Sequence, residues 1–306
     1  MKKIYIVTIL FTAVFFSCEE ESEIQYNQYV VNSFFSESVP FLIQTTNTVS
    51  VFDTATYFSI KDMEGELYED GEMVGNLVFQ DSYEREGLPG KVPEGYSVDG
   101  FTPQPGKEYS FELRHGDMII TGSDIIPYPV DFTITDTTTV LDDYDLMTKG
   151  IECQINFVDP PNENNYYLLT YNVTDFYDEN DDIGWTQGHG WMNSDDPAIE
   201  NDYYQQGLLY TGYRFIFSDQ YFNGKEYTIP VSFFVGHTSP RKKDLNIYLI
   251  SISEQYYNYV TSAINQQENN DDYYAEPTQV YNNIINGFGI FAGFSASKYV
   301  MEFKAR

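Results

Sequence analysis

Residues 109–121 of this 306-residue chain read YSFELRHGDMIIT. Apolar and polar side chains alternate along Tyr109–Leu113, which is typical of a strand with one buried face. His115, Gly116 and Asp117 then supply turn residues before a second apolar run at Met118–Thr121. The stretch predicts an antiparallel β-hairpin.

Short strands separated by turn residues continue on both sides of this hairpin, and no helical period of useful length appears there. The first part of the chain therefore predicts an immunoglobulin-like β-sandwich over residues 28–129. Strands are expected at Tyr29–Phe35, Phe41–Thr45, Thr56–Lys61, Asn76–Phe79, Tyr109–Arg114 and Met118–Thr121.

The prolines of Pro127-Tyr128-Pro129 interrupt any regular element, and the Thr-rich, acidic segment from Thr133 to Asp145 shows no apolar face. We place a domain boundary near Pro129, with a second β-rich domain over residues 130–306. A long loop region rich in Asp, Asn and Gly is expected from Thr174 to Tyr204. Further strands are expected at Gly150–Val158, Tyr166–Val173, Gly212–Phe217, Tyr227–Val235, Leu245–Ile252 and Ser297–Phe303.

One helix is predicted, near residues 253–267. Ser251 and Glu254 have the spacing of a capping box, and an apolar stripe follows on one face. Because a single amphipathic helix among strands usually covers a sheet, this helix is expected to pack on the second domain. The stripe consists of Tyr256, Val260, Ala263 and Ile264.

The chain is strongly acidic, with 47 Asp and Glu residues against 16 Lys and Arg and a net charge of −31. Nucleic acid is excluded as a natural partner, because binding to phosphates needs clustered basic side chains. The same charge would repel an anionic membrane surface. A solvated surface that keeps the protein soluble explains the charge most simply.

The first residues have the pattern of a lipoprotein signal peptide over residues 1–17. Two lysines precede an apolar run from Ile4 to Phe16, which is too short to span a bilayer, and Ser17-Cys18 follows it. Cys18 is therefore predicted to carry a lipid anchor. Residues 18–27 would form an acidic tether, and Glu19–Glu23 resembles the signal that sends Bacteroidetes lipoproteins to the exterior of the outer membrane. A merely solvated tether is the alternative.

The C-terminal stretch Glu276–Phe294, EPTQVYNNIINGFGIFAGF, resembles the closing signature of the Bacteroidetes lipoprotein family called domain of unknown function 4249. Its interleaved glycines and aromatic residues suit a tight apolar strand or turn where backbones approach closely. Further matches to the family lie at Phe157–Pro161, Asn165–Tyr167, Phe217–Asp219, Phe222–Gly224 and Ser251–Tyr259. The resemblance implies an outer-membrane lipoprotein, often found beside TonB-dependent transporters, and implies no particular chemistry.

The residues contain no recognisable catalytic motif. His115, His189 and His237 lie in no zinc-binding spacing, and Gly293–Ser297 lacks the last glycine of a nucleophile elbow. Cys153 shares the apolar phase of a strand and is expected to be a buried structural residue. We therefore predict a protein that is not an enzyme. A surface hydrolase acting on glycans stays open, because a carboxylate pair can hide among so many acids.

The loop region from Thr174 to Tyr204 offers the candidate site residues. Asp178, Asn180 and Asp182 place oxygen ligands at alternate positions, as a calcium loop does, although a solvated acidic loop is the simpler interpretation. No other cofactor is expected. Aromatic residues on a long loop suit contact with a sugar or a protein, although an apolar cluster that pins the loop is the alternative. The candidate contact residues are Trp185, His189, Trp191, Tyr203 and Tyr204.

Taken together, these patterns predict a surface-exposed outer-membrane lipoprotein that acts as a non-enzymatic ligand-binding or accessory subunit, associated with a TonB-dependent transporter. The alternatives are the glycan hydrolase and a purely structural or adhesive module. A carboxylate-lined cleft would favour the hydrolase, and an exposed aromatic patch would favour binding.

Overall fold

The fold is given by a computed structural model of the chain. It describes residues 28–48, 58–84, 91–141, 148–176, 184–188, 191–205, 212–235, 242–271 and 278–304. The mainly β class is confirmed, with several sheets and a single helix among the described residues. Within these ranges, no helix has the length and apolar character needed to cross a bilayer.

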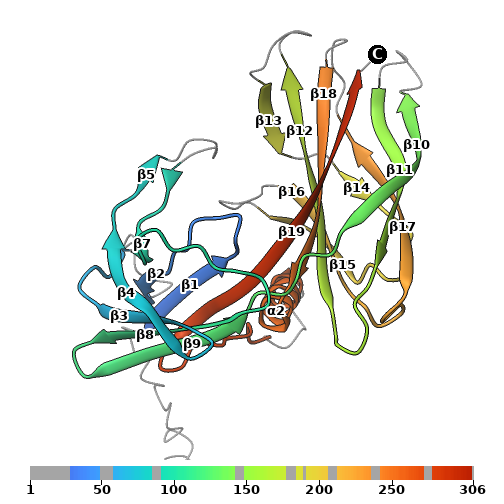
Figure 1. The fold of residues 1–306 in the computed structure, drawn as a ribbon. Helices are drawn as coiled ribbons and strands as arrows, with labels where there is room; N and C mark the ends of the chain where they lie inside the picture. The colour runs from blue at the N-terminus through green and yellow to red at the C-terminus, as the bar shows by residue number, and fades with distance from the viewer. Residues whose placement is uncertain are drawn as a thin grey trace, which may run out of the picture.

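The N-terminal part consists of short strands, as the sequence predicts, and includes the hairpin of β8 and β9 (Figure 1). Gly116 occupies the hairpin turn with a φ of 60°, a left-handed conformation that glycine adopts without strain. The strands of this part are β1 (Tyr29–Phe35), β2 (Gln44–Asn47), β3 (Glu64–Glu69), β4 (Glu72–Gln80), β5 (Tyr83–Glu84), β6 (Lys91–Val92), β7 (Gly95–Ser97), β8 (Glu108–His115) and β9 (Met118–Ile125).

The C-terminal part consists of longer strands and the helix α2 (Glu254–Asp271). Its strands are β10 (Phe132–Leu141), β11 (Thr148–Val158), β12 (Tyr166–Phe176), β13 (Gly184–Gly188), β14 (Met192–Asn193), β15 (Asn201–Gln205), β16 (Gly212–Ser218), β17 (Glu226–Phe234), β18 (Lys242–Ile252) and β19 (Phe288–Lys304).

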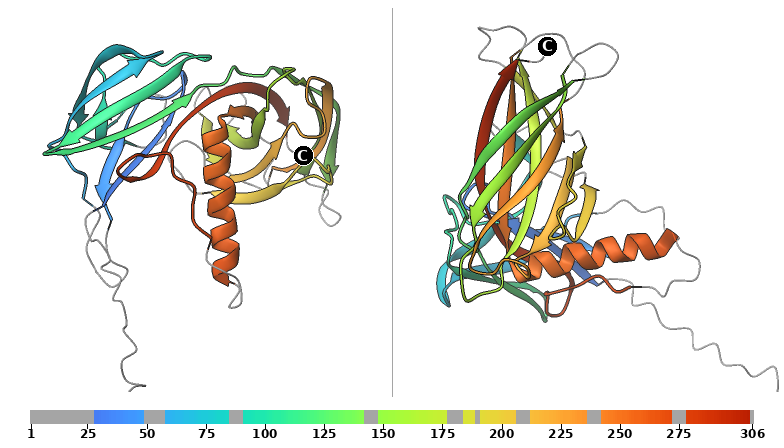
Figure 2. Two further views of the ribbon diagram at one scale, coloured as in Figure 1. Left: turned by 90° about the horizontal axis from the view of Figure 1, so that it is seen from below. Right: turned by 90° about the vertical axis from the view of Figure 1, so that its right-hand side faces the viewer.

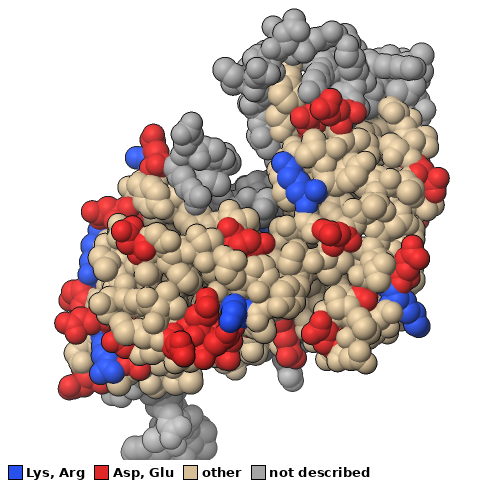
Figure 3. Space-filling view, in the orientation of Figure 1, with Lys and Arg blue, Asp and Glu red and all other residues tan. Residues whose placement is uncertain are grey.

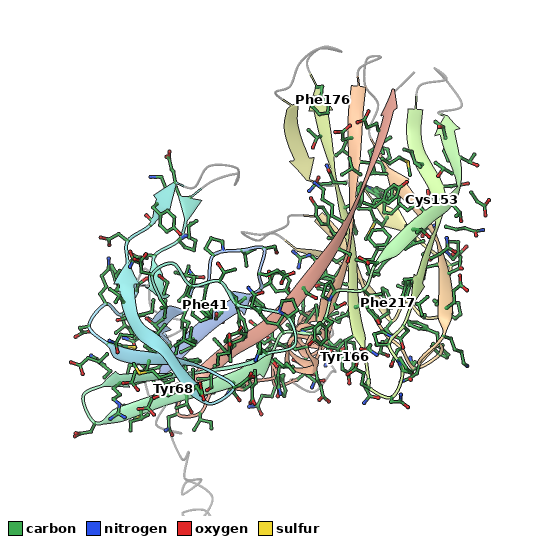
Figure 4. The ribbon with its side chains drawn as sticks, viewed as in Figure 1. Phe41, Tyr68, Cys153, Tyr166, Phe176 and Phe217 are labelled. Carbon is green, nitrogen blue, oxygen red and sulfur yellow. The ribbon has the colours of Figure 1, made fainter. Side chains whose placement is uncertain are left out.

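Two sandwiches share one large sheet. Its strands follow the order β15-β16-β12-β18-β19-β1-β2, with β13 beside β12. A five-stranded sheet, β7-β4-β3-β8-β9, packs on the β1 end and encloses an apolar core that includes Phe35, Phe111 and Phe291. A four-stranded sheet, β10-β11-β17-β14, packs on the other end around a second core that includes Phe157 and Phe217. Figure 4 labels Cys153 and Phe217 in this second sandwich.

The strand β19 connects the two sandwiches, and Figure 1 shows it running in red from one to the other. Its first residues pair in parallel with β1, where Val30 lies opposite Phe288. Its later residues pair antiparallel with β18, where Ile252 lies opposite Phe294. The described chain therefore begins on a strand that is already built into the central sheet.

Helix α2 covers the central sheet on the face opposite the N-terminal core, and Figure 2 shows it projecting away from the strands. Tyr256 and Val260 pack against Ile290 and Phe294, as the predicted stripe requires. The N-cap is Ser253, whose Oγ accepts a hydrogen bond from the Tyr256 amide at 3.1 Å. The predicted capping box at Ser251 and Glu254 was wrong by two residues, because β18 continues to Ile252.

Two further expectations were wrong. The Thr-rich segment after Pro129 forms the edge strand β10, in which Phe132 and Ile134 pack against the core and supply a faint apolar face. The long loop region between residues 174 and 204 contains the short strands β13, β14 and β15. Both segments are rich in polar residues because edge strands expose one face and one backbone edge to water.

Candidate functional site

Of the predicted contact residues, the two whose side chains the structure describes, Trp191 and Tyr203, lie in different surroundings. Trp191 is 73% exposed beside β14, whereas Tyr203 on β15 packs into the core beneath α2. The backbone of Trp185, on β13, pairs with the backbone of Asp175, on β12. His189 and the side chains of Trp185 and Tyr204 lie outside the described residues.

Trp191 has a fixed backbone and a free ring. Its carbonyl oxygen accepts hydrogen bonds from the Tyr171 hydroxyl at 3.1 Å and from the Phe234 amide at 2.9 Å. These bonds fix the backbone of Trp191 while its side chain stays 73% exposed, as a contact residue requires.

The predicted lipid-attachment and calcium sites lie outside the described residues. This applies to Cys18 and to the calcium candidates Asp178, Asn180 and Asp182. The described part of the chain contains no group of three His, Cys, Asp or Glu side chains able to hold a metal ion. Cys153 is buried, and burial raises the pKa of its thiol to about 11, which makes it a poor nucleophile.

Four of the motifs that resemble the family, between Phe157 and Gly224, meet at one end of the second sandwich, where two connections pass between its sheets. Asp159 follows β11, and its carboxylate accepts hydrogen bonds from the Tyr167 hydroxyl at 2.5 Å and the Gly224 amide at 2.8 Å. Asp219 follows β16, and its carboxylate accepts a hydrogen bond from the Asn223 amide group at 2.8 Å.

Both of these aspartates are buried, and burial raises the pKa of Asp159. Their partners come from the opposite connection or from their own turn. The described contacts therefore assign a structural role to the pair: they fasten the β11–β12 connection to the β16–β17 connection.

The C-terminal signature also fastens separate elements to one another, and such a set of contacts is called here a joint. The Asn283 side chain imitates a neighbouring strand, because its Oδ1 accepts from the Phe291 amide at 2.9 Å and its Nδ2 donates to the Phe291 carbonyl at 2.7 Å. Asn286 donates to the Ile119 carbonyl at 2.8 Å. These contacts dock the segment before β19 along the edge of β9.

The glycines of the signature permit a close approach of backbones, as the sequence predicts. Gly289 has a φ of 112°, and a Cβ there would lie 2.0 Å from the Val31 carbonyl oxygen. A Cβ at Gly293 would lie 2.3 Å from the Ile125 carbonyl oxygen. No side chain larger than hydrogen fits either position without a shift of the backbone.

Asp124 on β9 is the most enclosed carboxylate at this joint. Its Oδ2 accepts hydrogen bonds from the Ser253 hydroxyl and, at 2.8 Å, from the Gly293 amide. Burial nevertheless raises the pKa of Asp124 to about 7, because it outweighs the hydrogen bonds that favour the charged form. The group links β9, the helix N-cap and β19.

Two open depressions lie at the surface of the described residues, and the first borders the C-terminal signature. The first, called here the amide-lined cleft, encloses about 530 Å³ between α2 and a segment that runs beside it. The helix contributes Asn258, Thr261, Ser262 and Asn265, and the segment contributes Gln279–Asn282.

Hydrogen bonds fix the two walls of the amide-lined cleft. The Tyr281 amide donates to the Ser262 hydroxyl at 2.8 Å, and the Tyr281 hydroxyl donates to the Gln255 side chain. Further along, the Asn269 side chain donates to the Thr278 hydroxyl at 2.6 Å. The wall residues of α2 recur at i, i+3, i+4 and i+7, which places them on one helical face. The spacing of these polar residues is visible in the sequence, but the prediction considered only the apolar stripe of the helix.

The second depression, called here the charged groove, encloses about 590 Å³ on the five-stranded sheet. Its lining includes Glu66 and Glu112, which lie directly opposite each other on β3 and β8. Glu112 forms an ion pair with Arg114, and Glu66 accepts a hydrogen bond from Tyr68. Lys61 lies over the ring of Phe79 at the end of the groove.

Acidic side chains are distributed over the molecule. On the face drawn in Figure 3 they lie scattered with fewer basic side chains among them, and no basic patch gathers among the described residues of that face.

The fold and its joints define a mainly β protein in which β19 unites two sandwiches. The chain belongs to the family described as domain of unknown function (DUF4249), whose pattern matches residues 16–299. No curated protein matches the sequence. A chain from the structure described as "Complete structure of manganese lipoxygenase of Gaeumannomyces graminis and partial structure of zonadhesin of Komagataella pastoris" aligns over 92% of this chain and 96% of its own, at 9% identity and a TM-score of 0.22, and this similarity supports no argument.

Proposed function

We propose that the protein is a lipoprotein of the outer membrane of Bacteroidetes-type bacteria, anchored through Cys18 and exposed to the exterior. There it acts as a non-enzymatic binding or accessory subunit beside a TonB-dependent transporter. The signal-like residues 1–17, the acidic residues after Cys18 and the family membership support this proposal.

The position of β1 fits a short anchor. Tyr29 begins a strand inside the central sheet, and eleven residues, 18–28, separate it from the proposed lipid. Eleven residues span at most about 40 Å when fully extended. A body attached in this way would stay close to the membrane, within reach of an integral partner.

Three described carboxylates, Glu37, Asp124 and Asp159, have raised pKa values, and none of them lines either open depression. This separation is the observation that favours binding over catalysis. The described residues of the amide-lined cleft offer hydrogen bonds and no carboxylate. Proton transfer needs a titrating group within reach of a substrate, whereas binding does not.

The test is affinity purification of the native, membrane-anchored protein from its own cells in mild detergent, followed by mass spectrometry. Recovery of a TonB-dependent transporter in equal amounts is the expected result. Recovery of the protein alone would contradict the accessory role. Palmitate labelling that disappears in a Cys18→Ser variant would separately establish the anchor.

A glycan hydrolase is the second candidate, because Glu66 and Glu112 face each other in the charged groove. Glu66 already accepts a hydrogen bond from Tyr68, and Glu112 is already in an ion pair with Arg114 that favours its charged form, which is a poor starting point for a general acid. Release of reducing sugar from surface polysaccharides that is lost in both Glu66→Gln and Glu112→Gln would favour this candidate.

A further inference from the structure

The amide-lined cleft is unusual because no charged side chain is among the described residues that line it. All eight of these residues are uncharged, although 21% of the chain is Asp, Glu, Lys or Arg. A cation would find no carboxylate among them, and an anion would find no basic group and would meet a net charge of −31. The lining therefore selects a neutral ligand.

Hydrogen-bonding capacity remains free in the cleft. The side chains of Asn258, Asn265 and Gln279 form no hydrogen bond with the rest of the described chain. Each side-chain amide offers a donor and an acceptor side by side. Vicinal hydroxyl groups of a sugar present the complementary pair of groups.

The cleft also has a rigid frame and an apolar component. Two hydrogen bonds join the walls, from the Tyr281 amide to Ser262 and from the Tyr281 hydroxyl to Gln255, so the walls cannot separate without losing both. Val280 and the Tyr281 ring supply apolar surface, on which the C–H face of a sugar ring packs well. A volume of about 530 Å³ suits a small ligand or a short oligosaccharide segment.

We infer that the amide-lined cleft binds a neutral saccharide, with Asn258, Asn265 and Gln279 as its hydrogen-bonding residues. This inference rests on the proposed binding function and names the ligand class of that function. It assigns no role to the charged groove.

The test uses the full-length protein in detergent on an array of neutral gluco-, manno-, galacto- and xylo-oligosaccharides, together with sialylated and sulfated glycans and unmodified peptides. At least one neutral saccharide should bind, and a combined Asn258→Ala and Gln279→Ala variant should bind it at least about tenfold more weakly. Asn193→Ala, on exposed β14, serves as the matched control and should bind normally.

Four results would overturn the inference: no binding of neutral saccharides, equal binding of sulfated ones, preference for peptides, or equal loss in the Asn193→Ala control.

Recovery of a transporter with the cleft variant separates the cleft inference from the proposed accessory function. A variant that loses saccharide binding and retains the transporter supports both, whereas a wild-type protein that binds no saccharide and still recovers the transporter refutes only the cleft inference.

Discussion

The Asp124 carboxylate accepts the hydroxyl hydrogen of Ser253, 129 residues further along the chain, and this bond joins the five-stranded sheet to the helix N-cap. Ser253 also accepts from the Tyr256 amide and donates its own amide to the Gly293 carbonyl at 3.1 Å. A strand, a helix and the shared strand β19 therefore meet at one buried carboxyl group.

This carboxyl group should make stability depend on pH. The pKa of Asp124 is about 7 in the folded chain and about 3.8 when exposed, so the folded state retains a proton that the unfolded state loses between these values. The free energy of unfolding should therefore fall from about pH 4 to about pH 7, by up to roughly 4 kcal/mol, and this group should contribute no further change above pH 7.

Asp124→Asn should remove this part of the pH dependence, because Asn is neutral throughout and still offers an acceptor oxygen. Urea unfolding of both proteins at several pH values measures the difference. Asp99→Asn, at an exposed turn, is the control and should follow the wild type. Parallel curves for wild type and Asp124→Asn would contradict the raised pKa.

Ser253→Ala should destabilise the fold by about 1–3 kcal/mol, since it removes a helix N-cap and leaves a buried carboxyl with one donor fewer. Chemical unfolding monitored by circular dichroism provides the measurement. The Ser110→Ala variant, on a partly exposed position of β8, should change stability by no more than about 0.5 kcal/mol. Equal effects of the two substitutions would refute the joint.

Gly289→Ala should prevent normal folding, because its Cβ would overlap the Val31 carbonyl oxygen at a φ that other residues rarely adopt. Gly100→Ala is the matched control. It also has a positive φ, of 65°, but no atom lies within 4 Å of its added Cβ, so only the backbone strain remains. Yield of folded protein and melting temperature distinguish the two, and a wild-type melting temperature for Gly289→Ala would refute the parallel pairing of β1 and β19.

The local sequence pattern predicted the hairpin of β8 and β9, the bounds of β1 and the apolar stripe of α2, because hydrophobic periodicity and turn residues are local properties of the sequence. It could not predict that β1 pairs with β19, since 250 residues and more separate partners such as Val31 and Gly289. The glycines of the signature indicated a close approach of backbones but not the partner strand. Strand β10 was missed because, among its described side chains, only Phe132 and Ile134 pack against the core.

The candidate site was predicted less well than the fold. Trp191 and Tyr203 are near in sequence, yet one lies at the surface beside β14 and the other beneath α2, because the strands between them belong to different sheets. The amide-lined cleft depends on a segment folding back along α2, as the Tyr281–Ser262 bond shows. The polar face of a helix is usually solvated, so the sequence gave no reason to predict a binding site on the polar face of α2.

Tyr167→Phe should cost about 1–3 kcal/mol, because it withdraws a donor from the buried Asp159 carboxylate and strands a polar group in the core. A double-mutant cycle with Asp159→Asn measures how much of the loss belongs to the pair. A coupling of about 1 kcal/mol or more is expected, and additive effects would show that the two side chains stabilise the connections independently.

Trp191→Ala should leave the free energy of unfolding within about 0.5 kcal/mol of wild type, because the ring is 73% exposed and the backbone bonds to Tyr171 and Phe234 survive the change. Phe222→Ala, which empties a position that is 1% exposed, should instead cost about 3–5 kcal/mol. If recovery of a partner falls in Trp191→Ala while stability is unchanged, the ring serves contact. A stability loss near that of Phe222→Ala would instead make Trp191 part of an apolar cluster that pins its own segment, and its predicted contact role would be withdrawn.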